Sequence, residues 1–208
     1  MTRRFVVSGT DTNVGKTVFS AGLAGALGAF YWKPIQSGVA PEGDKETVMR
    51  LSGLPADHIL PERYRLNAPL SPHRSAELDG IVIQPAMLVP PDGLGPLVIE
   101  GAGGLMVPIT RTFLQIDLYQ KWHLPVILVT RTTLGTINHT LLSIAAMRSR
   151  GIPIHGIAFV GEDNFDNIRT IGEMGDVRVL GRLPHLPQLN AHTLRDAFMT
   201  HFREEDFR

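Results

Sequence analysis

The residues with the clearest chemical potential lie near the start of the chain, in the segment G-T-D-T-N-V-G-K-T from Gly9 to Thr17. Glycines allow backbone N–H groups to face phosphate oxygens, and a helix that begins here adds the positive end of its dipole. Lys16 supplies a positive charge and Thr17 a hydroxyl that can bind Mg²⁺. The spacing differs from the common G-x-x-x-x-G-K-[ST] pattern, because five residues separate Gly9 from Gly15. A glycine-rich turn with an exposed lysine fits the flanking sequence less well, so the segment predicts a phosphate-binding loop.

Two carboxylates are candidates to complete a magnesium site with Thr17. Glu100 follows the apolar residues 97–99 and precedes the glycine-rich stretch 101–104, so we expect it at the end of a buried strand, before a turn. Asp44 is expected in the loop after the second strand. Mg²⁺ held by one hydroxyl and phosphate oxygens usually has such carboxylates nearby. The alternatives are a plain surface position for Glu100 and a turn-forming role for Asp44.

Two further features could bind anions. Lys33 follows an apolar strand and precedes Pro34, which predicts a position at the carboxyl end of the sheet, where ligands of open α/β folds bind. A solvated surface lysine is the alternative. The segment G-T-I-N, residues 135–138, is expected to open a helix whose free N–H groups and dipole can bind a carboxylate. Thr136 could also simply cap this helix.

The elements that must position these residues follow from the hydrophobic pattern. Short apolar runs predict strands at 5–8, 30–32, 97–99, 126–130, 155–160 and 177–180. Amphipathic stretches between them predict helices at 15–27, 112–122, 136–150, 165–174 and 192–203, with Gly151 ending the third. This alternation predicts an α/β fold of the P-loop NTPase kind, with a mostly parallel sheet flanked by helices on both faces. Residues 55–96 are rich in proline and polar residues and predict a loop with one short helix near 85–89.

Composition narrows the class of partner. The chain has 208 residues, which predicts a single domain over 1–208, and its 20 basic residues balance 20 acidic ones. The balance gives no reason to expect nucleic acid or a membrane as partner. No cysteine is present, no apolar run is long enough for a membrane span, and no secretory segment opens the chain, so we expect a cytoplasmic protein. The histidines lack the spacing of a zinc site.

Six blocks of the sequence resemble dethiobiotin synthetases and come in the order seen in that family. They are G-T-D-T-N-V-G-K-T (9–17), K-P-I-Q-S-G (33–38), S-P-H (71–73), E-G-A-G-G (100–104), L-P-V-I-L-V (124–129) and L-G-T-I-N-H (134–139). The resemblance extends from near residue 5 to about residue 160, roughly three quarters of the chain. The additional residue in the phosphate loop is itself a feature of the family, so it supports the resemblance.

The resemblance implies an activity and an assembly. The protein is expected to be a homodimeric ligase of biotin biosynthesis that uses ATP and Mg²⁺ to convert 7,8-diaminononanoate and CO₂ into dethiobiotin. An amine captures CO₂ as a carbamate, the carbamate takes the γ-phosphoryl group, and the second amine closes the cyclic urea. Fixed cations are needed to bring the two anionic reactants together.

The resemblance also implies roles for individual residues. The residues expected at the reacting groups are Thr12, Lys16, Lys33 and Ser37, and those expected to hold Mg²⁺ are Thr17, Asp44 and Glu100. Lys33 and Ser37 are expected to bind the substrate together with a helix start that reaches it across the dimer interface, formed by Gly135, Thr136 and Asn138. The nucleotide is expected to contact Asp11, Thr12, Asn13, Val14, Gly15, Lys16, Thr17, Glu100 and Gly103. His73 and His139 receive no chemical role.

The sequence departs from the family at the position expected to meet the base. Many members carry an asparagine there that contacts adenine, and Val160 takes its place in this chain. A valine cannot pair with an amine, so base recognition would fall to residues 161–163 or 183–188, and use of several nucleotides becomes a hypothesis.

Two other classes of protein share the expected fold. A nucleotide-dependent switch or partitioning ATPase usually carries a lysine near the start of the loop, where this chain has Asp11. A related amidoligase or regulatory domain would lack the diamine chemistry, and the blocks at 33–38 and 71–73 argue against it.

Overall fold

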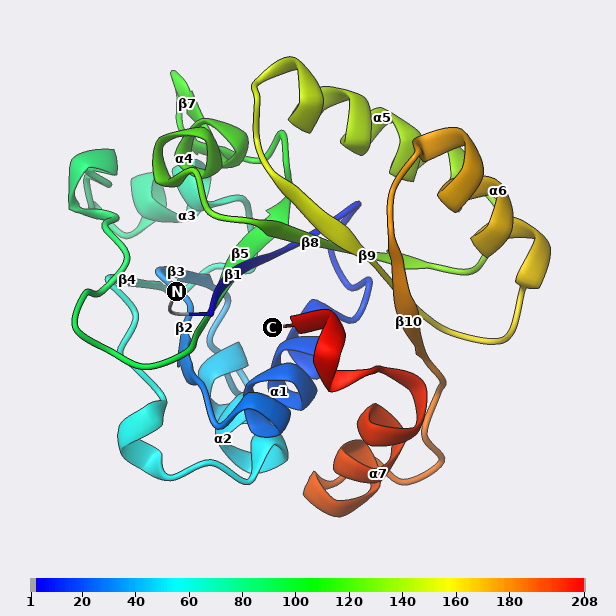
Figure 1. Cartoon of the computed structure of the whole chain (residues 1–208). Helices are drawn as coiled ribbons and strands as arrows, with labels where there is room; N and C mark the ends of the chain where they lie inside the picture. Colours follow the sequence, from blue (N-terminus) through cyan, green and yellow to red (C-terminus); the bar gives the residue numbers. More distant parts are fainter. Residues whose placement is uncertain (1–2, 208) are drawn as a thin grey trace.

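The computed structural model describes residues 3–207, and a six-stranded sheet forms its centre (Figure 1). The strand order is β10-β9-β8-β1-β5-β2, and each neighbouring pair runs parallel. The strands are β1 (Arg4–Gly9), β2 (Phe30–Trp32), β5 (Leu97–Gly104), β8 (Val126–Arg131), β9 (Ile154–Val160) and β10 (Val179–Leu183). Because parallel strands all end at one edge, β1, β5 and β2 bring their carboxyl ends together there.

Helices cover both faces of the sheet, as the sequence predicts. Alternate strand residues face opposite sides: Val7 packs in one apolar core and Val6 in the other. The helices on the Val7 side are α1 (Lys16–Leu27), α2 (Asp44–Ser52) and α7 (Ala191–His201), and those on the Val6 side are α4 (Gln115–Trp122), α5 (Thr136–Ser149) and α6 (Phe165–Gly175) (Figure 1). Within residues 3–207, none of the helices has the length and apolar character that a bilayer span needs.

A smaller layer lies beyond β2 and includes most of the segment predicted to be loop. Its elements are β3 (Ile35–Ser37), η1 (Ala56–His58), β4 (Tyr64–Leu66), α3 (Pro72–Leu78), η2 (Pro85–Met87), β6 (Pro108–Thr110) and β7 (Phe113–Leu114). The short helix predicted near residues 85–89 is confirmed as η2, but the loop prediction for 55–96 was wrong where η1, β4 and α3 form. The strand β4 exists because it pairs with β3, from a distant part of the chain, and both bury residues in a shared core with Ile109. A local pattern cannot reveal such a pairing.

Several predicted boundaries also differ from the structure. Strand β5 continues through the glycines to Gly104, because it remains paired with β1, so Glu100 lies within a strand and not before a turn. Asp44 is the first residue of α2 and not part of a loop. Helix α4 begins at Gln115 and not at residue 112, since the preceding residues form the β6–β7 hairpin. Strand β10 begins at Val179 and not at residue 177.

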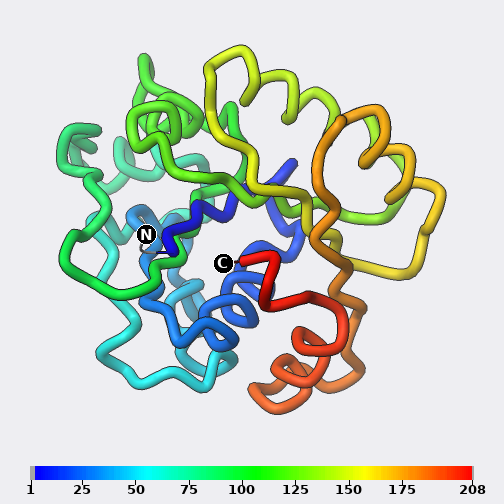
Figure 2. Tube along the Cα trace, viewed as in Figure 1, coloured from blue at the N-terminus to red at the C-terminus, as the bar shows by residue number. Residues whose placement is uncertain are grey.

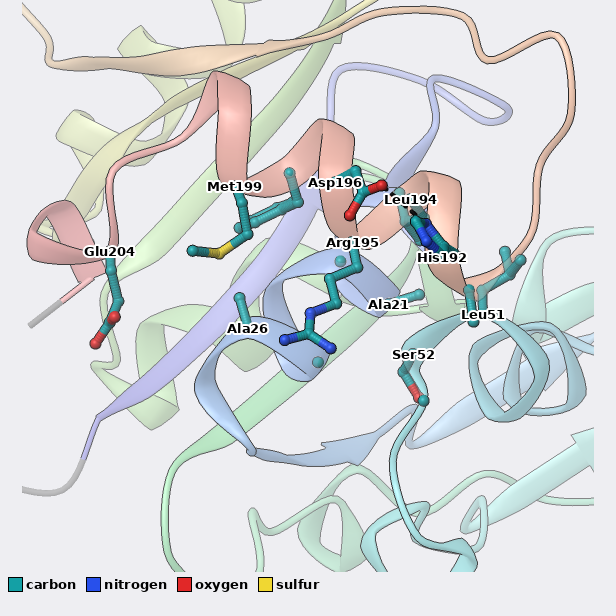
Figure 3. A pocket seen from close by; sticks show the side chains of 15 residues that line it. Ala21, Ala26, Leu51, Ser52, His192, Leu194, Arg195, Asp196, Met199 and Glu204 are labelled. Atoms are coloured by element: carbon teal, nitrogen blue, oxygen red, sulfur yellow. Dashed lines mark ion pairs between the residues drawn. The ribbon is translucent and has the colours of Figure 1, made fainter.

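The helix α7 packs closely against α1 and α2 although it is far from both in the sequence, as Figure 2 shows for α1 and α7. A glycine lets α1 approach α2: a Cβ on Gly25 would lie 2.5 Å from the Ser52 carbonyl oxygen of α2. A hollow of about 680 Å³ remains between these helices (Figure 3). Arg195 extends into it from α7, while His192 and Asp196 pair 2.8 Å apart. None of the residues predicted to do chemistry lines this hollow.

Candidate active site

The predicted phosphate loop connects β1 to α1 and folds back over its own first glycine. A Cβ on Gly9 would lie 2.8 Å from the Val14 side chain and 2.9 Å from the carbonyl oxygen of Asp11, so the loop requires glycine there. The Lys16 ammonium crosses the loop and donates to that same carbonyl oxygen at 2.9 Å. Gly15 precedes α1 with φ 96° and no side chain caps the helix, so the first N–H groups remain available to an anion.

A buried carboxylate connects the loop to the neighbouring strands. The Glu100 side chain is fully buried, and its Oε1 accepts hydrogen bonds from the Thr17 hydroxyl at 2.9 Å and the Lys33 ammonium at 3.0 Å. Lys33 also pairs with Asp44. The structure therefore brings together four of the residues predicted to do chemistry, which come from α1, the end of β2, α2 and β5.

Two residues in this network were missed by the sequence analysis. The Tyr31 hydroxyl donates to Oε2 of Glu100 at 3.0 Å. Tyr31 stands two residues before Lys33, so the two-residue period of a strand could have placed both on the same face. The Gln36 amide accepts from the backbone N–H of Asp44 at 3.2 Å and donates to the Gly38 carbonyl at 2.8 Å, which fixes the start of α2. No local signal in the sequence indicated this contact.

The electrostatics keep the site charged. Burial alone would lower the pKa of Lys33, but Glu100 and Asp44 raise it above its ordinary value. Burial alone would raise the pKa of Asp44, but Lys33 holds it below its ordinary value. Burial, opposed by the Glu100 carboxylate, lowers the pKa of Lys16 to about 8. Lys33, Lys16 and Asp44 therefore carry their charges at neutral pH.

These groups line a cavity of about 880 Å³. Its walls include every residue predicted at the reacting groups and the metal, together with Gly103 from the predicted nucleotide site: Thr12, Lys16, Thr17, Lys33, Ser37, Asp44, Glu100 and Gly103. The Ser37 hydroxyl is buried, and within residues 3–207 it has no hydrogen-bond partner. Since buried hydroxyls in proteins are normally paired, a ligand in the cavity is a suitable partner for it.

The residues present fit a magnesium ion. Thr17, Asp44 and Glu100 offer oxygen ligands around the Lys33 ammonium, which is the chemistry Mg²⁺ prefers. In the part of the chain that the structure describes, no three His, Cys, Asp or Glu side chains are grouped for a metal. A nucleotide-site Mg²⁺ needs no such group, because it is bound by one or two carboxylates together with substrate phosphates.

The predicted carboxylate-binding helix start lies outside this cavity. Gly135, at φ 90°, precedes α5, and Thr136 is the first helical residue. The Thr136 hydroxyl donates to the Arg131 carbonyl at 2.6 Å and caps no helix N–H, so the capping alternative was wrong. Gly135 and Thr136 line a separate small hollow with Thr10 and Asp11, and Asn138 is exposed. Within one chain, the structure does not bring these three residues to Lys33 and Ser37.

An apolar hollow of about 400 Å³ lies on the other side of the phosphate loop. Val160 and Gly161 line it together with residues 183–186. Val160 packs directly against the loop, since a Cβ on Gly15 would lie 2.9 Å from its side chain. Of the positions expected to replace the missing asparagine, residues 161 and 183–186 line this hollow, whereas residues 162, 163, 187 and 188 do not.

The sheet, the loop and the buried Lys16 define a P-loop nucleotide-binding protein, and similar solved structures share this fold. A ParA family ATPase from Chlorobium tepidum TLS superposes with a TM-score of 0.54 at 16% identity, covering 95% of this chain and 98% of that one. A chain of the MinC:MinD cell division protein complex from Aquifex aeolicus gives a TM-score of 0.52 at 15% identity, covering 94% of this chain and 86% of that one. At such low identity these likenesses show the fold alone.

Sequence relatives identify the family. The model of an AAA domain family matches residues 3–193. ATP-dependent dethiobiotin synthetase BioD of Nitrobacter hamburgensis is 58% identical over 207 residues, covering 100% of this chain and 98% of its own. The enzyme of the same name from Novosphingobium aromaticivorans is 58% identical and covers 98% of each. The chain belongs to the ATP-dependent dethiobiotin synthetase family, and not to the partitioning ATPases.

Proposed function

We propose that this protein is a dethiobiotin synthetase that closes the ureido ring from 7,8-diaminononanoate and CO₂ at the expense of ATP, in the cytoplasm. The observation that carries the proposal is the cavity in which two buried cations, Lys16 and Lys33, face the carboxylates of Asp44 and Glu100. This arrangement suits two anionic reactants, a carbamate and a triphosphate, which repel each other in the absence of fixed positive charge. The full-length relatives support the same activity.

Different residues of the chain bind the different reacting groups. Lys16 and the free N–H groups at the start of α1 bind the terminal phosphates, and Lys33 holds the carbamate oxygen against the γ-phosphorus. The Ser37 hydroxyl, which has no partner among residues 3–207, and the loop residue Thr12 hydrogen-bond the carbamate and the anhydride it forms. The second amine then attacks the anhydride carbon, and phosphate leaves. No side chain needs to become a covalent intermediate.

Magnesium is proposed as the metal of this site. When bound, it would neutralise phosphate charge, with Thr17, Asp44 and Glu100 as its protein ligands. The loop residues Asp11, Asn13, Val14 and Gly15, together with Gly103 of β5, complete the proposed nucleotide site.

We further propose a homodimer with a shared active site. Met106 and Leu142 are exposed and line one hollow with Thr10 and Asp11, next to the phosphate loop. Leu134 is fully exposed beside the hollow that contains Gly135 and Thr136. An apolar surface that adjoins a loop of the active site is suited to a second copy. The N-terminus of α5 would then offer its N–H groups to the carboxylate of a substrate held by the other copy.

Diamine-dependent phosphate release tests the proposed activity. The protein is incubated with ATP, Mg²⁺, bicarbonate and 7,8-diaminononanoate, and phosphate is measured with and without the diamine. Release that requires the diamine is expected. Equal release without it would point to a nucleotide switch instead.

A substitution in the cavity tests the roles of the cations. Lys33→Ala is expected to lower kcat/KM for the diamine by at least about 100-fold, as loss of one buried electrostatic contact does in other enzymes. Lys121→Ala is the matched control, because Lys121 lies over the Phe113 ring away from the cavity. Unchanged kinetics in the Lys33 variant would remove it from the mechanism.

A further inference from the structure

The side chain of Arg131, the last residue of β8, contacts the phosphate loop. Its terminal nitrogen Nη2 donates to the carbonyl oxygens of Thr12 and Asn13, at 3.1 Å each. Arg131 lies 118 positions after Asn13 in the sequence, and the contact forms because β8 pairs with β1, the strand that leads into the loop. Arg131 is not among the residues of the proposed nucleotide, metal and substrate sites.

These hydrogen bonds orient two peptide groups of the loop. In a trans peptide the carbonyl and the following N–H point in opposite directions, so carbonyls held toward Arg131 turn the N–H groups of Asn13 and Val14 away from it. Arg131 does not line the 880 Å³ cavity, whereas Thr12 and Asn13 do. Within residues 3–207, neither N–H has a hydrogen-bond partner, so both remain available to phosphate oxygens.

The loop adopts a backbone conformation that requires support. Asn13 has φ 58°, in the left-handed region that residues with a side chain rarely adopt. Such a conformation persists only where surrounding contacts hold it. A left-handed residue in a turn also helps to direct successive N–H groups into one anion-binding concavity. The hydrogen bond from Arg131 to the carbonyl of Asn13 itself is a contact that holds this conformation.

Lys16 is not sufficient to hold the loop. Its ammonium donates to the carbonyl of Asp11 at 2.9 Å, but the same ammonium is the cation that a phosphate loop directs to the terminal phosphates. The guanidinium of Arg131 stays protonated, and its position is fixed, because β8 pairs with β1 and β9. The Arg131 carbonyl also accepts from the Thr136 hydroxyl at 2.6 Å. Arg131 can therefore hold the loop both before and after a nucleotide binds.

We propose that Arg131 is a positioning residue that holds the phosphate loop in its anion-binding conformation before the nucleotide arrives. A loop that is already ordered requires less binding energy to enclose a triphosphate, so Arg131 contributes to nucleotide affinity and not to the transfer of the phosphoryl group. The inference rests on the proposed nucleotide site.

The variant Arg131→Met tests this role, because methionine keeps an extended side chain but has no N–H donor. The Kd of ATP with Mg²⁺, measured by titration calorimetry without diamine, is expected to rise about tenfold, as for the loss of a hydrogen bond from a charged donor. In the diamine-dependent phosphate assay, the KM for ATP should rise by a similar factor. The kcat at saturating ATP and the KM for the diamine should keep their wild-type values, because a bound triphosphate itself holds the loop.

Two further variants serve as controls. Arg148→Met is the matched control, because Arg148 of α5 also donates to a main-chain carbonyl at the surface, that of Asp176, at 2.8 Å. This variant should bind ATP with wild-type affinity. Arg131→Lys keeps a cation with several N–H donors and is expected to have a Kd between those of wild type and Arg131→Met.

Three outcomes would overturn the inference. The first is an unchanged Kd for ATP in Arg131→Met. The second is a raised KM for the diamine with wild-type nucleotide affinity, because Arg131 would then act on the substrate. The third is a urea unfolding midpoint below that of Arg148→Met, which would show that Arg131 supports the fold as a whole. Since the calorimetry uses no diamine, a protein that binds ATP but gives no diamine-dependent phosphate release would lose the proposed function and keep this inference.

Discussion

At the scale of residues, the site is organised around one buried carboxylate. Glu100 receives hydrogen bonds from Thr17, Lys33 and Tyr31, and a buried charge persists only when it is paired in this way. The sequence identified Thr17, Lys33 and Glu100, because each follows or belongs to an apolar strand or a recognisable loop. In the sequence, Tyr31 looks like an ordinary strand residue. Its contact with Glu100 can be recognised only in the structure, where β2 lies beside β5.

The first prediction concerns Tyr31 as a positioning residue. Tyr31→Phe keeps the ring but removes the donor to Glu100, so the protein is expected to lose about 1–3 kcal/mol of stability, the cost of an unsatisfied buried group. The substitution should also raise the KM for Mg²⁺ more than it lowers kcat at saturating metal, because Glu100 loses one of the hydrogen bonds that hold its carboxylate in place. Urea unfolding and a magnesium titration of turnover measure the two effects.

Tyr64→Phe serves as the control for this change. The Tyr64 hydroxyl accepts from the Gln84 N–H at an exposed position, and water can replace it. A Tyr31 variant that matched this control in stability and in magnesium dependence would contradict a positioning role.

At the scale of elements, helices and strands with a strong local pattern were predicted within a few residues, and short ones were not. Helix α1, for example, was predicted at 15–27 and is found at Lys16–Leu27. The pair β3 and β4 has three residues in each strand and depends on partners far along the chain. The helix α2 was missed because the polar residues around Asp44 give a weak apolar stripe, and its position depends on packing against α1.

Packing of α1 on α2 leads to a prediction at Gly25. Gly25→Ala is expected to destabilise the fold, because overpacking against the Ser52 backbone costs about 1–3 kcal/mol. That cost exceeds the gain of up to about 1 kcal/mol that alanine brings to a helix. Gly95→Ala is the matched control, since its added methyl group meets nothing within 4 Å. Equal unfolding midpoints for both variants in urea would contradict the tight contact.

The contact between His155 and the last helical turn, η3 (Glu204–Phe207), predicts that the stability of the protein depends on pH. His155 of β9 lies against the Phe5 ring and hydrogen-bonds the Asp206 carbonyl through Nε2 at 2.6 Å. Burial lowers the pKa of His155, so between its folded pKa and the unfolded value of about 6.5 the unfolded chain binds more protons. The stability contributed by neutral His155 is therefore present above about pH 6.5 and is lost as the pH falls through the folded pKa.

Unfolding free energies measured from pH 7.5 to 5 check this expectation. Wild-type protein should lose stability more steeply with acid than His155→Gln, which cannot titrate. His185→Gln, at an exposed position, should keep the wild-type slope. Parallel curves of unfolding free energy against pH for wild type and His155→Gln would refute the prediction that His155 causes this loss of stability.

At the scale of the whole molecule, the family and the parallel sheet were predictable from the sequence, but the shape of the site was not. The sequence grouped the residues by family pattern, while the structure separates them into a cavity with Lys33 and a distinct hollow with Gly135. That separation has a physical source, because the two groups follow strands on opposite sides of β1. The proposed second copy would bring the two groups together.

The prediction at this scale is that Leu142→Glu separates the copies. A charge at this exposed leucine of α5 should halve the mass measured by light scattering and lower turnover, since each site would lose the helix start of its partner. Met174→Glu, at another exposed apolar residue, on α6, should leave the mass unchanged. A wild-type protein that is monomeric at the concentrations used in the assay would refute the shared site.

The contact between Phe5 of β1 and Phe207 of η3, with ring centroids 6.2 Å apart, has a consequence for biosynthesis. The two rings are separated by most of the chain, so at translation rates of about 5–20 residues per second the second is made on the order of 10 to 40 seconds after the first. During that interval the apolar side of the first strand lacks its final cover. Exposed apolar surface on an incomplete chain favours aggregation, so this strand is at its most vulnerable until residue 207 has been added.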